Sequence, residues 1–294
     1  MKSVNSNMNG ILIIDKPSGL TSRDVVNEIS KLFNTKEVGH TGTLDPLATG
    51  VLVICVGSAT KLVEYLTHQD KEYIGECTLG INTDTLDITG NILEEKSVLI
   101  EKEKIESVLN SFKGEYLQEV PLYSSIKIKG KKLYEYAREG VDVDLPSKRV
   151  KINSIELLDY KYELGKTIFT FKCSVSKGTY IRSLIRDISK KLDTIGTMSN
   201  LRRTKVGDFK IESSKKLDEI NSNDLINIID VLNIKKVNIP KNLEKLILNG
   251  SIIENKYDSE EVLFVKDNQA IAIYKKYDKD DSKLKPYKMF KGGI

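Results

Sequence analysis

A glycine-rich segment at residues 39–50 (GHTGTLDPLATG) constrains the chain most, because its composition is poor for a hydrophobic core and good for a site. It holds three glycines, a histidine and one acid, Asp45, between two apolar stretches. Pro46 disfavours the helical conformation of Asp45, so this residue is expected in an extended or turn conformation. A carboxylate on a loop between regular elements is placed to meet a ligand. The segment therefore predicts a functional loop.

Buried strands are expected on both sides of this loop. Residues 10–15 are largely apolar, and the turn signal at residues 16–19 (KPSG) ends the first strand. Residues 51–56 (VLVICV) predict a second buried strand directly after the loop. A helix should lie between the first strand and the loop, with Thr21 or Ser22 as its N-cap. Its apolar face is expected to hold Val25, Val26, Ile29, Leu32 and Phe33.

The clearest pattern of regular structure lies at residues 167–192. Apolar and polar residues alternate from 169 to 176, which predicts a half-buried strand. The turn signal SKGT follows, and apolar residues then recur with helical spacing up to Leu192. Arg182 falls in the first turn of this helix and outside its apolar stripe. It therefore follows a strand-to-helix turn, a common place for site residues in α/β proteins.

Weaker patterns divide the rest of the chain. After about residue 232 the sequence becomes rich in Asn and Lys and then contains two strand-like pieces. We therefore expect two domains, residues 1–232 and a small β-rich domain at residues 233–294. The further predicted elements are a strand at 71–81, a polar loop at 84–90, helices at 60–66 and 100–112, and strands at 261–265 and 270–275.

The composition favours a cytoplasmic globular protein without a metal or a membrane partner. Apolar residues make up 39% and charged residues 30%, and the longest apolar run is far too short to span a bilayer. The first ten residues lack the apolar segment of a signal peptide. Two histidines with no nearby cysteine cluster give no zinc-site spacing. The three widely spaced cysteines fit reduced thiols in a core and are Cys55, Cys77 and Cys173.

The net charge of +4 is concentrated in one stretch. Residues 124–151 hold eight basic and four acidic residues, so their local excess equals that of the whole chain. This stretch is either a solvated lysine-rich hairpin or an arm that tracks phosphates, with interleaved tyrosines for stacking. The basic residues are Lys127, Lys129, Lys131, Lys132, Arg138, Lys148, Arg149 and Lys151.

Several familiar kinds of site do not fit the Asp45 loop. A P-loop requires a lysine after its last glycine, and none follows Gly42 or Gly50 in that way. An aspartyl-phosphate site would usually carry a second acid where Leu47 stands, and no Gly-x-Ser-x-Gly marks a serine hydrolase. Residues 84–90 miss the ligand spacing of a calcium loop. What remains is one carboxylate that acts as a nucleophile or electrostatically.

The order of several motifs resembles the TruB-type tRNA pseudouridine synthases over roughly residues 10–210. The long Asp45 segment is the most specific of them, and the C-terminal part resembles an RNA-binding PUA module weakly, at residues 248–250 (LNG). One departure is the Ser-Ser at residues 124–125, where the family often has Ser-Ala. The other matching segments are DKP at 15–17, KEY at 71–73, GKKLYEYAREG at 130–140, KGTYIR at 177–182 and LRR at 201–203.

This resemblance implies an α+β fold with a mixed, largely antiparallel sheet, flanking helices and a small C-terminal PUA-like β domain. It implies an isomerase that converts uridine 55 of the tRNA T loop to pseudouridine without a cofactor. The uridine would be flipped out of the T arm, which the insertion at about 124–151 would hold, and the enzyme is expected to be a monomer. By the same resemblance Asp45, Tyr73 and Arg182 are catalytic, and His40, Tyr180 and Leu201 line the nucleotide pocket.

Two alternatives stay open at this point. One is a non-catalytic protein that binds or folds tRNA, and the other is a synthase of the same chemistry that acts on another RNA. Lys16 either orients the Asp45 loop or simply ends a strand.

Overall fold

The computed structural model describes residues 8–290, so the outermost ends of both predicted domains lie outside it. One ten-stranded sheet runs through most of the chain in the order β14-β1-β3-β12-β4-β11-β10-β7, with β2 paired to β3 and β13 to β12. Among the described strand pairs of this sheet, β1/β14 and β3/β12 are parallel and the others are antiparallel. The strands are β1 (Gly10–Lys16), β2 (Val38–His40), β3 (Thr49–Val56), β4 (Lys71–Leu79), β7 (Gly114–Glu119), β10 (Ser147–Glu163), β11 (Lys166–Val175), β12 (Gly196–Val206), β13 (Phe209–Lys210) and β14 (Lys215–Lys216).

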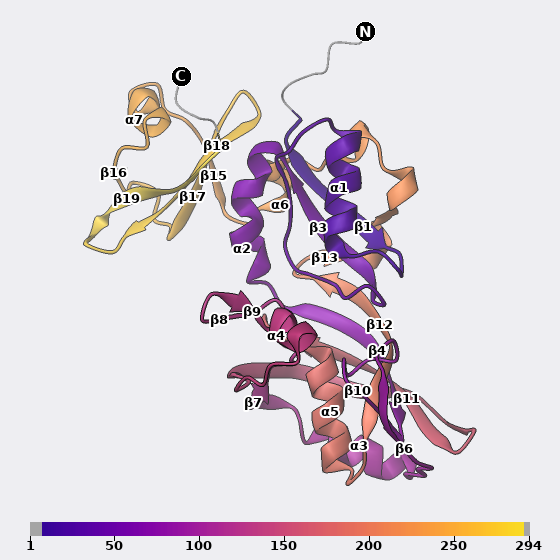
Figure 1. Cartoon of the computed structure of the whole chain (residues 1–294). Coiled ribbons are helices and arrows are strands. Elements are labelled where there is room, and N and C mark those ends of the chain that lie inside the picture. The colour runs from indigo at the N-terminus through magenta and orange to yellow at the C-terminus, as the bar shows by residue number, and fades with distance from the viewer. Residues whose placement is uncertain (1–7, 291–294) are drawn as a thin grey trace.

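The helices flank this sheet in two groups. Figure 1 shows α1 and α2 beside one half of the sheet and α3 and α5 beside the other, with β12 and β4 between them. The fold is therefore α+β with a mixed, largely antiparallel sheet, as predicted. The helices are α1 (Ser22–Leu32), α2 (Val63–Thr67), α3 (Lys102–Asn110), α4 (Leu133–Glu139), α5 (Ile181–Lys191), α6 (Ile228–Val231) and α7 (Glu244–Leu248).

Local sequence explains where these helices begin and which side they bury. Thr21 is the N-cap of α1 and forms a capping box with Asp24. The prediction that Leu32 lies on the buried face of this helix is wrong. Leu32 is 53% exposed, and Phe33 is the last buried residue of this segment. The apolar stripe of α5 packs on the sheet in one core cluster, together with Phe169 and Phe171 of β11. The segment predicted to be helical at 60–66 is a 3₁₀ helix (Gly57–Leu62) followed by α2.

The parallel contact between β3 and β12 requires a glycine. Gly50 has φ +101° and pairs with Arg203, and a Cβ at Gly50 would lie 2.2 Å from the Arg203 carbonyl oxygen. Any side chain here would separate the two strands. The glycine therefore brings β12 against the end of the loop that carries Asp45.

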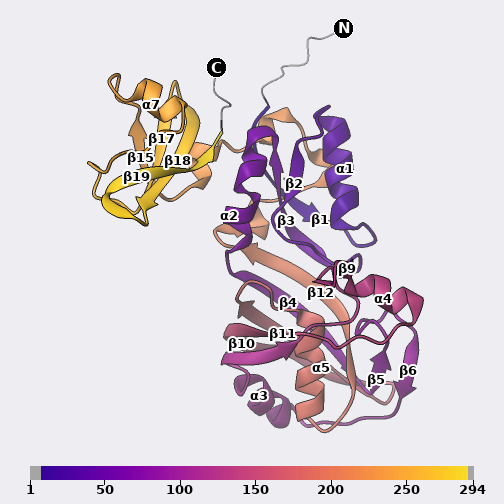
Figure 2. The same cartoon turned by 60° about the vertical axis from the view of Figure 1, so that its left-hand side comes forward.

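The C-terminal residues form a second sheet in the order β15-β17-β18-β19-β16, which Figure 2 shows beside the α2 side of the main sheet. Leu263, Val265 and Ile273 of this sheet share a core cluster with Ile11 and Val53 of β1 and β3. The predicted boundary at 232/233 falls between α6 and β15 and stays a proposal. The strands are β15 (Lys235–Asn238), β16 (Ile253–Glu254), β17 (Glu261–Lys266), β18 (Gln269–Tyr277) and β19 (Asp280–Met289).

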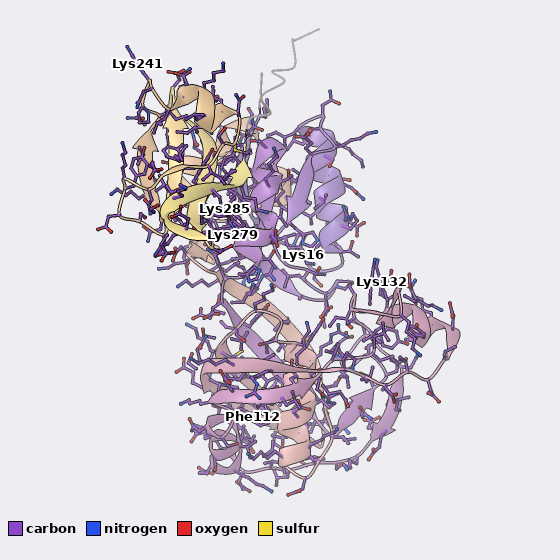
Figure 3. The ribbon with its side chains drawn as sticks, turned by 90° about the vertical axis from the view of Figure 1, so that its left-hand side faces the viewer. Lys16, Phe112, Lys132, Lys241, Lys279 and Lys285 are labelled. Carbon is purple, nitrogen blue, oxygen red and sulfur yellow. The ribbon has the colours of Figure 1, made fainter. Side chains whose placement is uncertain are left out.

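Two short hairpins complete the fold. β5 (Ile81–Thr83) pairs with β6 (Ile92–Glu95), and β8 (Lys127–Ile128) pairs with β9 (Lys131–Lys132) next to α4. We call residues 124–151 the arm. Figure 3 shows Lys132 among the side chains that project from it. Within residues 8–290 no helix is long and apolar enough to cross a membrane.

Candidate active site

Asp45 and Arg182 form a bidentate ion pair. Arg182 Nε donates to one carboxylate oxygen of Asp45 and Nη2 to the other, both at 2.9 Å. Asp45 comes from the loop before β3, and its turn is closed by the Ala48 N–H, which donates to the Asp45 carbonyl oxygen. This parallel pairing fixes the orientation of the carboxylate as well as its place.

Arg182 is buried, with only 6% of its surface exposed. The sequence pattern placed it outside the apolar stripe of α5, and the structure shows that this side of the helix faces the site instead of solvent. Two further N–H groups donate to the carbonyl oxygens of Thr85 and Tyr123, at 2.8 and 3.0 Å. A second carboxylate, Asp87, lies 4.0 Å from Nη1. Four of the five N–H donors of the guanidinium are thus hydrogen-bonded, which holds it against Asp45.

Lys16 holds the Asp45 loop through hydrogen bonds to backbone carbonyl oxygens. This lysine is fully buried, and its ammonium donates to the carbonyl oxygens of Pro17, Leu20 and Pro46. Burial lowers the pKa of Lys16 to about 8, an effect that the nearby Asp45 carboxylate partly offsets. Of the two roles left open for Lys16, the structure shows that it orients the loop.

Ser22 and Arg203 fix the same loop at other points. The Ser22 hydroxyl accepts from the Leu44 N–H at 2.8 Å. Arg203 is 2% exposed and donates to the Gly42 carbonyl oxygen at 3.0 Å and to the Val51 carbonyl oxygen at 2.7 Å. The Asp45 carboxylate is therefore presented on a loop with fixed ends, which is the preorganisation that catalysis requires.

A pocket of about 340 Å³ opens beside the ion pair. Its wall includes Tyr73 from β4, Tyr180 from the residue before α5, and Leu201 from β12. Tyr73 and Leu201 are 8% and 5% exposed, so each shows the pocket only part of its side chain. Burial raises the pKa of Tyr180, which keeps its hydroxyl neutral. Five of the six predicted site residues thus meet around one pocket.

His40 is the sixth, and it does not line this pocket. It lies on β2 opposite Ile54, and its ring Nδ1 is buried without a hydrogen-bond partner among the residues described. Burial, and after it the charges of Arg203 and Arg23, lower the pKa of His40. The ring is therefore neutral at physiological pH.

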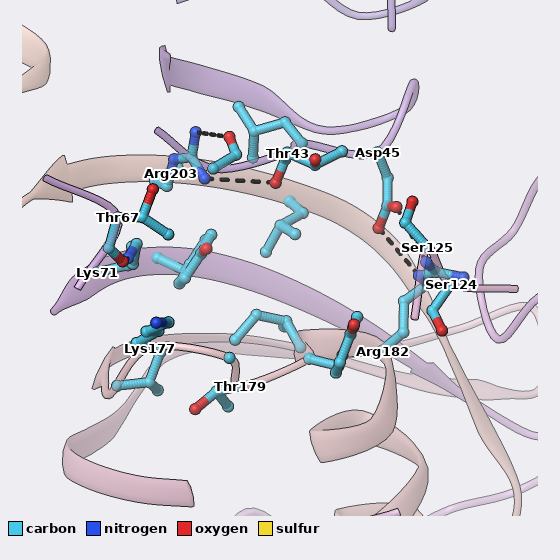
Figure 4. A pocket seen from close by; sticks show the side chains of 18 of the residues that line it. Thr43, Asp45, Thr67, Lys71, Ser124, Ser125, Lys177, Thr179, Arg182 and Arg203 are labelled. Carbon is cyan, nitrogen blue, oxygen red and sulfur yellow. Dashed lines mark hydrogen bonds and ion pairs between the residues drawn. The ribbon is translucent and has the colours of Figure 1, made fainter. Parts of the chain in front are cut away.

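The end of the pocket away from the ion pair is basic. Figure 4 shows Lys71, Lys177 and Arg203 on that side, with Asp45 and Arg182 on the other. Burial, and then the Arg203 charge, lower the pKa of Lys71 to about 8. None of the three forms an ion pair with a carboxylate of residues 8–290. Sequence reasoning assigned them no role, although each lies in a motif segment that carried the resemblance.

The base of the arm forms another wall. Ser124, Ser125 and Tyr134 of the arm line the pocket, as does Tyr123 just before it, so the arm is part of the site and not a separate hairpin on the surface. Lys131 and Lys132 lie over the rings of arm tyrosines, while Lys127 and Lys129 are exposed.

The chemistry available here is that of a fixed carboxylate. Within the described part of the chain, no three histidine, cysteine or acidic side chains are grouped to hold a metal ion. The site offers a carboxylate 31% exposed to the pocket, flat aromatic walls for a planar ring, and cations for an anionic group. It suits a ligand with a planar ring and an anionic group.

Comparisons with known proteins agree with this arrangement. Residues 30–181 match the TruB family pseudouridylate synthase N-terminal domain, and residues 182–232 match the tRNA pseudouridylate synthase B C-terminal domain. A tRNA pseudouridine synthase B from Caldanaerobacter subterraneus is 46% identical over 90% of this chain and 94% of its own. The Bacillus subtilis protein of that name is 41% identical over 96% and 97%.

Solved structures show the same fold. A chain from the crystal structure of a Cbf5–Nop10–Gar1 complex superposes with a TM-score of 0.71 and 26% identity, over 97% of this chain and 86% of that chain. A chain from an H/ACA RNP bound to a substrate RNA containing 2′-deoxyuridine superposes with a TM-score of 0.67 and 25% identity, over 96% and 85%.

Proposed function

The chain belongs to the TruB family of pseudouridylate synthases, and from this premise we propose that it converts uridine 55 in the T loop of tRNA to pseudouridine. The observation that carries the proposal is the bidentate Asp45–Arg182 pair at the edge of a pocket walled by aromatic residues. The relatives named tRNA pseudouridine synthase B support tRNA as the substrate.

The reaction moves uracil without oxidation or hydrolysis. The bond from C1′ to N1 breaks, a bond from C1′ to C5 forms, C5 loses a proton and N1 gains one. Asp45 would start this exchange beside the sugar, either by attacking a carbon or by removing the 2′ hydrogen. Arg182 keeps the carboxylate aimed at the sugar. The balance needs no cofactor.

The detached ring must stay in the pocket while it turns over. Tyr73 offers a flat face for stacking and a hydroxyl near the position of the proton lost from C5. Tyr180 and Leu201 close the pocket around the ring, which limits escape of the free base.

The RNA would be gripped on two sides. The arm is suited to the backbone around the target, since Lys127 and Lys129 are exposed on it. At the basic end of the pocket, Lys71, Lys177 and Arg203 would meet a phosphate next to the flipped nucleotide. Flipping costs a few kcal/mol. His40, neutral and outside the pocket, would occupy the space that the base leaves in the RNA stack.

We assign catalysis to residues 1–232 and an RNA-binding role to the PUA-like residues 233–294, acting within a monomer. Light scattering of the purified chain with and without tRNA tests the monomer. A variant that ends at residue 232 is not a fair test of the second role, because the two sheets share a core cluster.

Mapping pseudouridine by position tests the whole proposal. The purified chain is incubated with unmodified tRNA transcripts and, separately, with ribosomal RNA. Pseudouridine at position 55 alone supports the proposal. Modification only elsewhere indicates a synthase for another RNA, and tight tRNA binding with no product indicates a binding or folding protein.

A further inference from the structure

The amide of Gln118 is paired with both backbone groups of Tyr180. Its side-chain oxygen accepts from the Tyr180 N–H at 2.8 Å, and its side-chain nitrogen donates to the Tyr180 carbonyl oxygen at 3.1 Å. Gln118 is 1% exposed, near the end of β7, and the same nitrogen also contacts the Tyr116 hydroxyl. One buried side chain thus makes two hydrogen bonds to the Tyr180 backbone, as the backbone of a neighbouring strand would.

Tyr180 stands at the start of the helix that carries Arg182. It is the N-cap of α5, with an extended backbone (φ −98°, ψ 116°), and its own side chain makes no capping hydrogen bond. The Tyr180 ring lines the pocket, and Arg182 follows two residues later. The backbone position of Tyr180 therefore fixes where the Tyr180 ring lies in the pocket. It also fixes where the first turn of α5 begins, and with it the position of the Arg182 guanidinium beside Asp45.

The next residue of β7 fastens the same turn. The Glu119 carbonyl oxygen accepts from the Ser183 hydroxyl at 2.8 Å, and the Glu119 carboxylate pairs with Arg186 at 2.7 Å. The end of β7 is thus tied to the first two turns of α5, with Gln118 at the contact nearest the pocket.

We propose that Gln118 is a positioning residue for the reaction, which acts by holding the backbone of Tyr180 so that the Tyr180 ring and Arg182 meet the nucleotide and Asp45 in register. Gln118 does not line the pocket, so its effect passes through these two residues. The inference rests on the proposed function, because it assigns Gln118 to the same site.

Pairing with both backbone groups of Tyr180 requires a side chain that presents one acceptor and one donor, as an amide does. Leucine in its place would leave the Tyr180 N–H without a partner, and the Tyr180 carbonyl oxygen would keep only its bond from the Leu184 N–H. A carboxylate still accepts from the N–H but turns a second acceptor toward the carbonyl oxygen. A protonated glutamate restores a donor at that position. Glutamine and protonated glutamate should therefore work where ionised glutamate fails.

The test uses Gln118→Leu, Gln118→Glu and a matched control, Thr167→Val. Thr167 is fully buried on β11, accepts from the Ile100 N–H and donates to the Val98 carbonyl oxygen, and it does not line the pocket. The control thus removes a buried hydroxyl that both donates and accepts a hydrogen bond, at a position outside the pocket. The measured quantities are the single-turnover rate of pseudouridine formation with enzyme in excess, the tRNA dissociation constant and the melting temperature.

For Gln118→Leu we expect a rate lower by roughly 10- to 100-fold, the size expected for misplaced catalytic groups, and a dissociation constant within threefold of the original. Thr167→Val should lose similar thermal stability and keep its rate within threefold. Gln118→Glu should regain rate relative to Gln118→Leu as the pH falls from 8 to 6. An unchanged rate in Gln118→Leu, an equal loss in Thr167→Val, or no pH-dependent recovery in Gln118→Glu would overturn the inference.

A crystal structure of Gln118→Leu separates this inference from the proposed function. If the original chain modifies a different RNA, the same rates are measured on that RNA. If it modifies none, the proposed function fails, and the crystal structure alone decides whether Gln118 positions the site. Displaced Tyr180 and a lengthened Arg182–Asp45 contact support the inference, and an unchanged pair overturns it.

Discussion

Arg182 holds the Asp45 carboxylate through two hydrogen bonds of 2.9 Å, although 137 positions separate the two residues in the chain. Arg182 is buried and donates four hydrogen bonds, whereas Asp45 keeps 31% of its side chain exposed. The pair therefore has one immobile partner and one partner that substrate can reach. The first two predictions below depend on this asymmetry.

Asp45→Asn should abolish pseudouridine formation, by more than about 10³-fold in single-turnover rate, because the amide keeps the shape of the side chain but loses its charge and reactivity. The tRNA dissociation constant should change by less than fivefold. Asp15→Asn is the matched control, since Asp15 also pairs with an arginine, Arg202, outside the pocket lining. An active Asp45→Asn enzyme would remove Asp45 from catalysis.

Arg182→Lys should lower the rate by on the order of 10²-fold while keeping the positive charge. Lysine cannot bond both Asp45 oxygens and the Thr85 and Tyr123 carbonyl oxygens at once. Each buried carbonyl left unpaired costs about 1–3 kcal/mol, so chemical denaturation should show a lower free energy of unfolding. Arg202→Lys should leave the rate within threefold. Equal rates for Arg182→Lys and the original chain would show that charge alone suffices.

Replacing Lys127, Lys129, Lys131 and Lys132 with alanine should weaken tRNA binding and flatten its dependence on salt, because fewer counterions are released on binding. Binding is titrated at several salt concentrations. A control with four alanines at lysines of α3, β10 and the turn after α3 should keep the original slope; these are Lys102, Lys104, Lys113 and Lys161. The same slope in both variants would exclude the arm from the interface.

Lys71 should make tRNA affinity depend on pH. Its pKa is lowered to about 8, so its side chain is positively charged below that pH and loses this charge as the pH rises through it. Affinity should therefore fall between pH 7 and pH 9. Lys71→Met should bind more weakly at pH 7 and show a smaller fall in affinity, whereas Lys172→Met, which removes a half-buried lysine paired with Glu72, should keep the original profile. An undiminished fall in Lys71→Met would assign the pH effect elsewhere.

Lys16 also has a pKa of about 8, but it lies under the Asp45 loop and outside the pocket lining. Its deprotonation should change the rate rather than the affinity. Dissociation constants and single-turnover rates measured on the same samples therefore separate Lys16 from Lys71.

Local patterns predicted the regular elements well where one physical preference dominated. The strand at β11, an N-cap at Thr21 or Ser22 and the stripe of α5 all follow from side-chain spacing and local hydrogen-bonding preferences. Leu32 was misplaced because helical spacing is the same whether or not a neighbouring element covers that turn. The type of fold came from the resemblance, and the strand order of the sheet required the structure.

The sequence by itself determined that one acid stands on a glycine-flanked loop and that Arg182 follows a strand-to-helix turn. Those are properties of neighbouring residues, and short-range sterics decide them. Only the tertiary structure decided that the two meet, that Lys16 and Arg203 fix the loop, that the arm walls the pocket and that Gln118 holds Tyr180. Each of these contacts joins residues distant in the chain, and strand pairing and burial, which no local pattern records, bring them together.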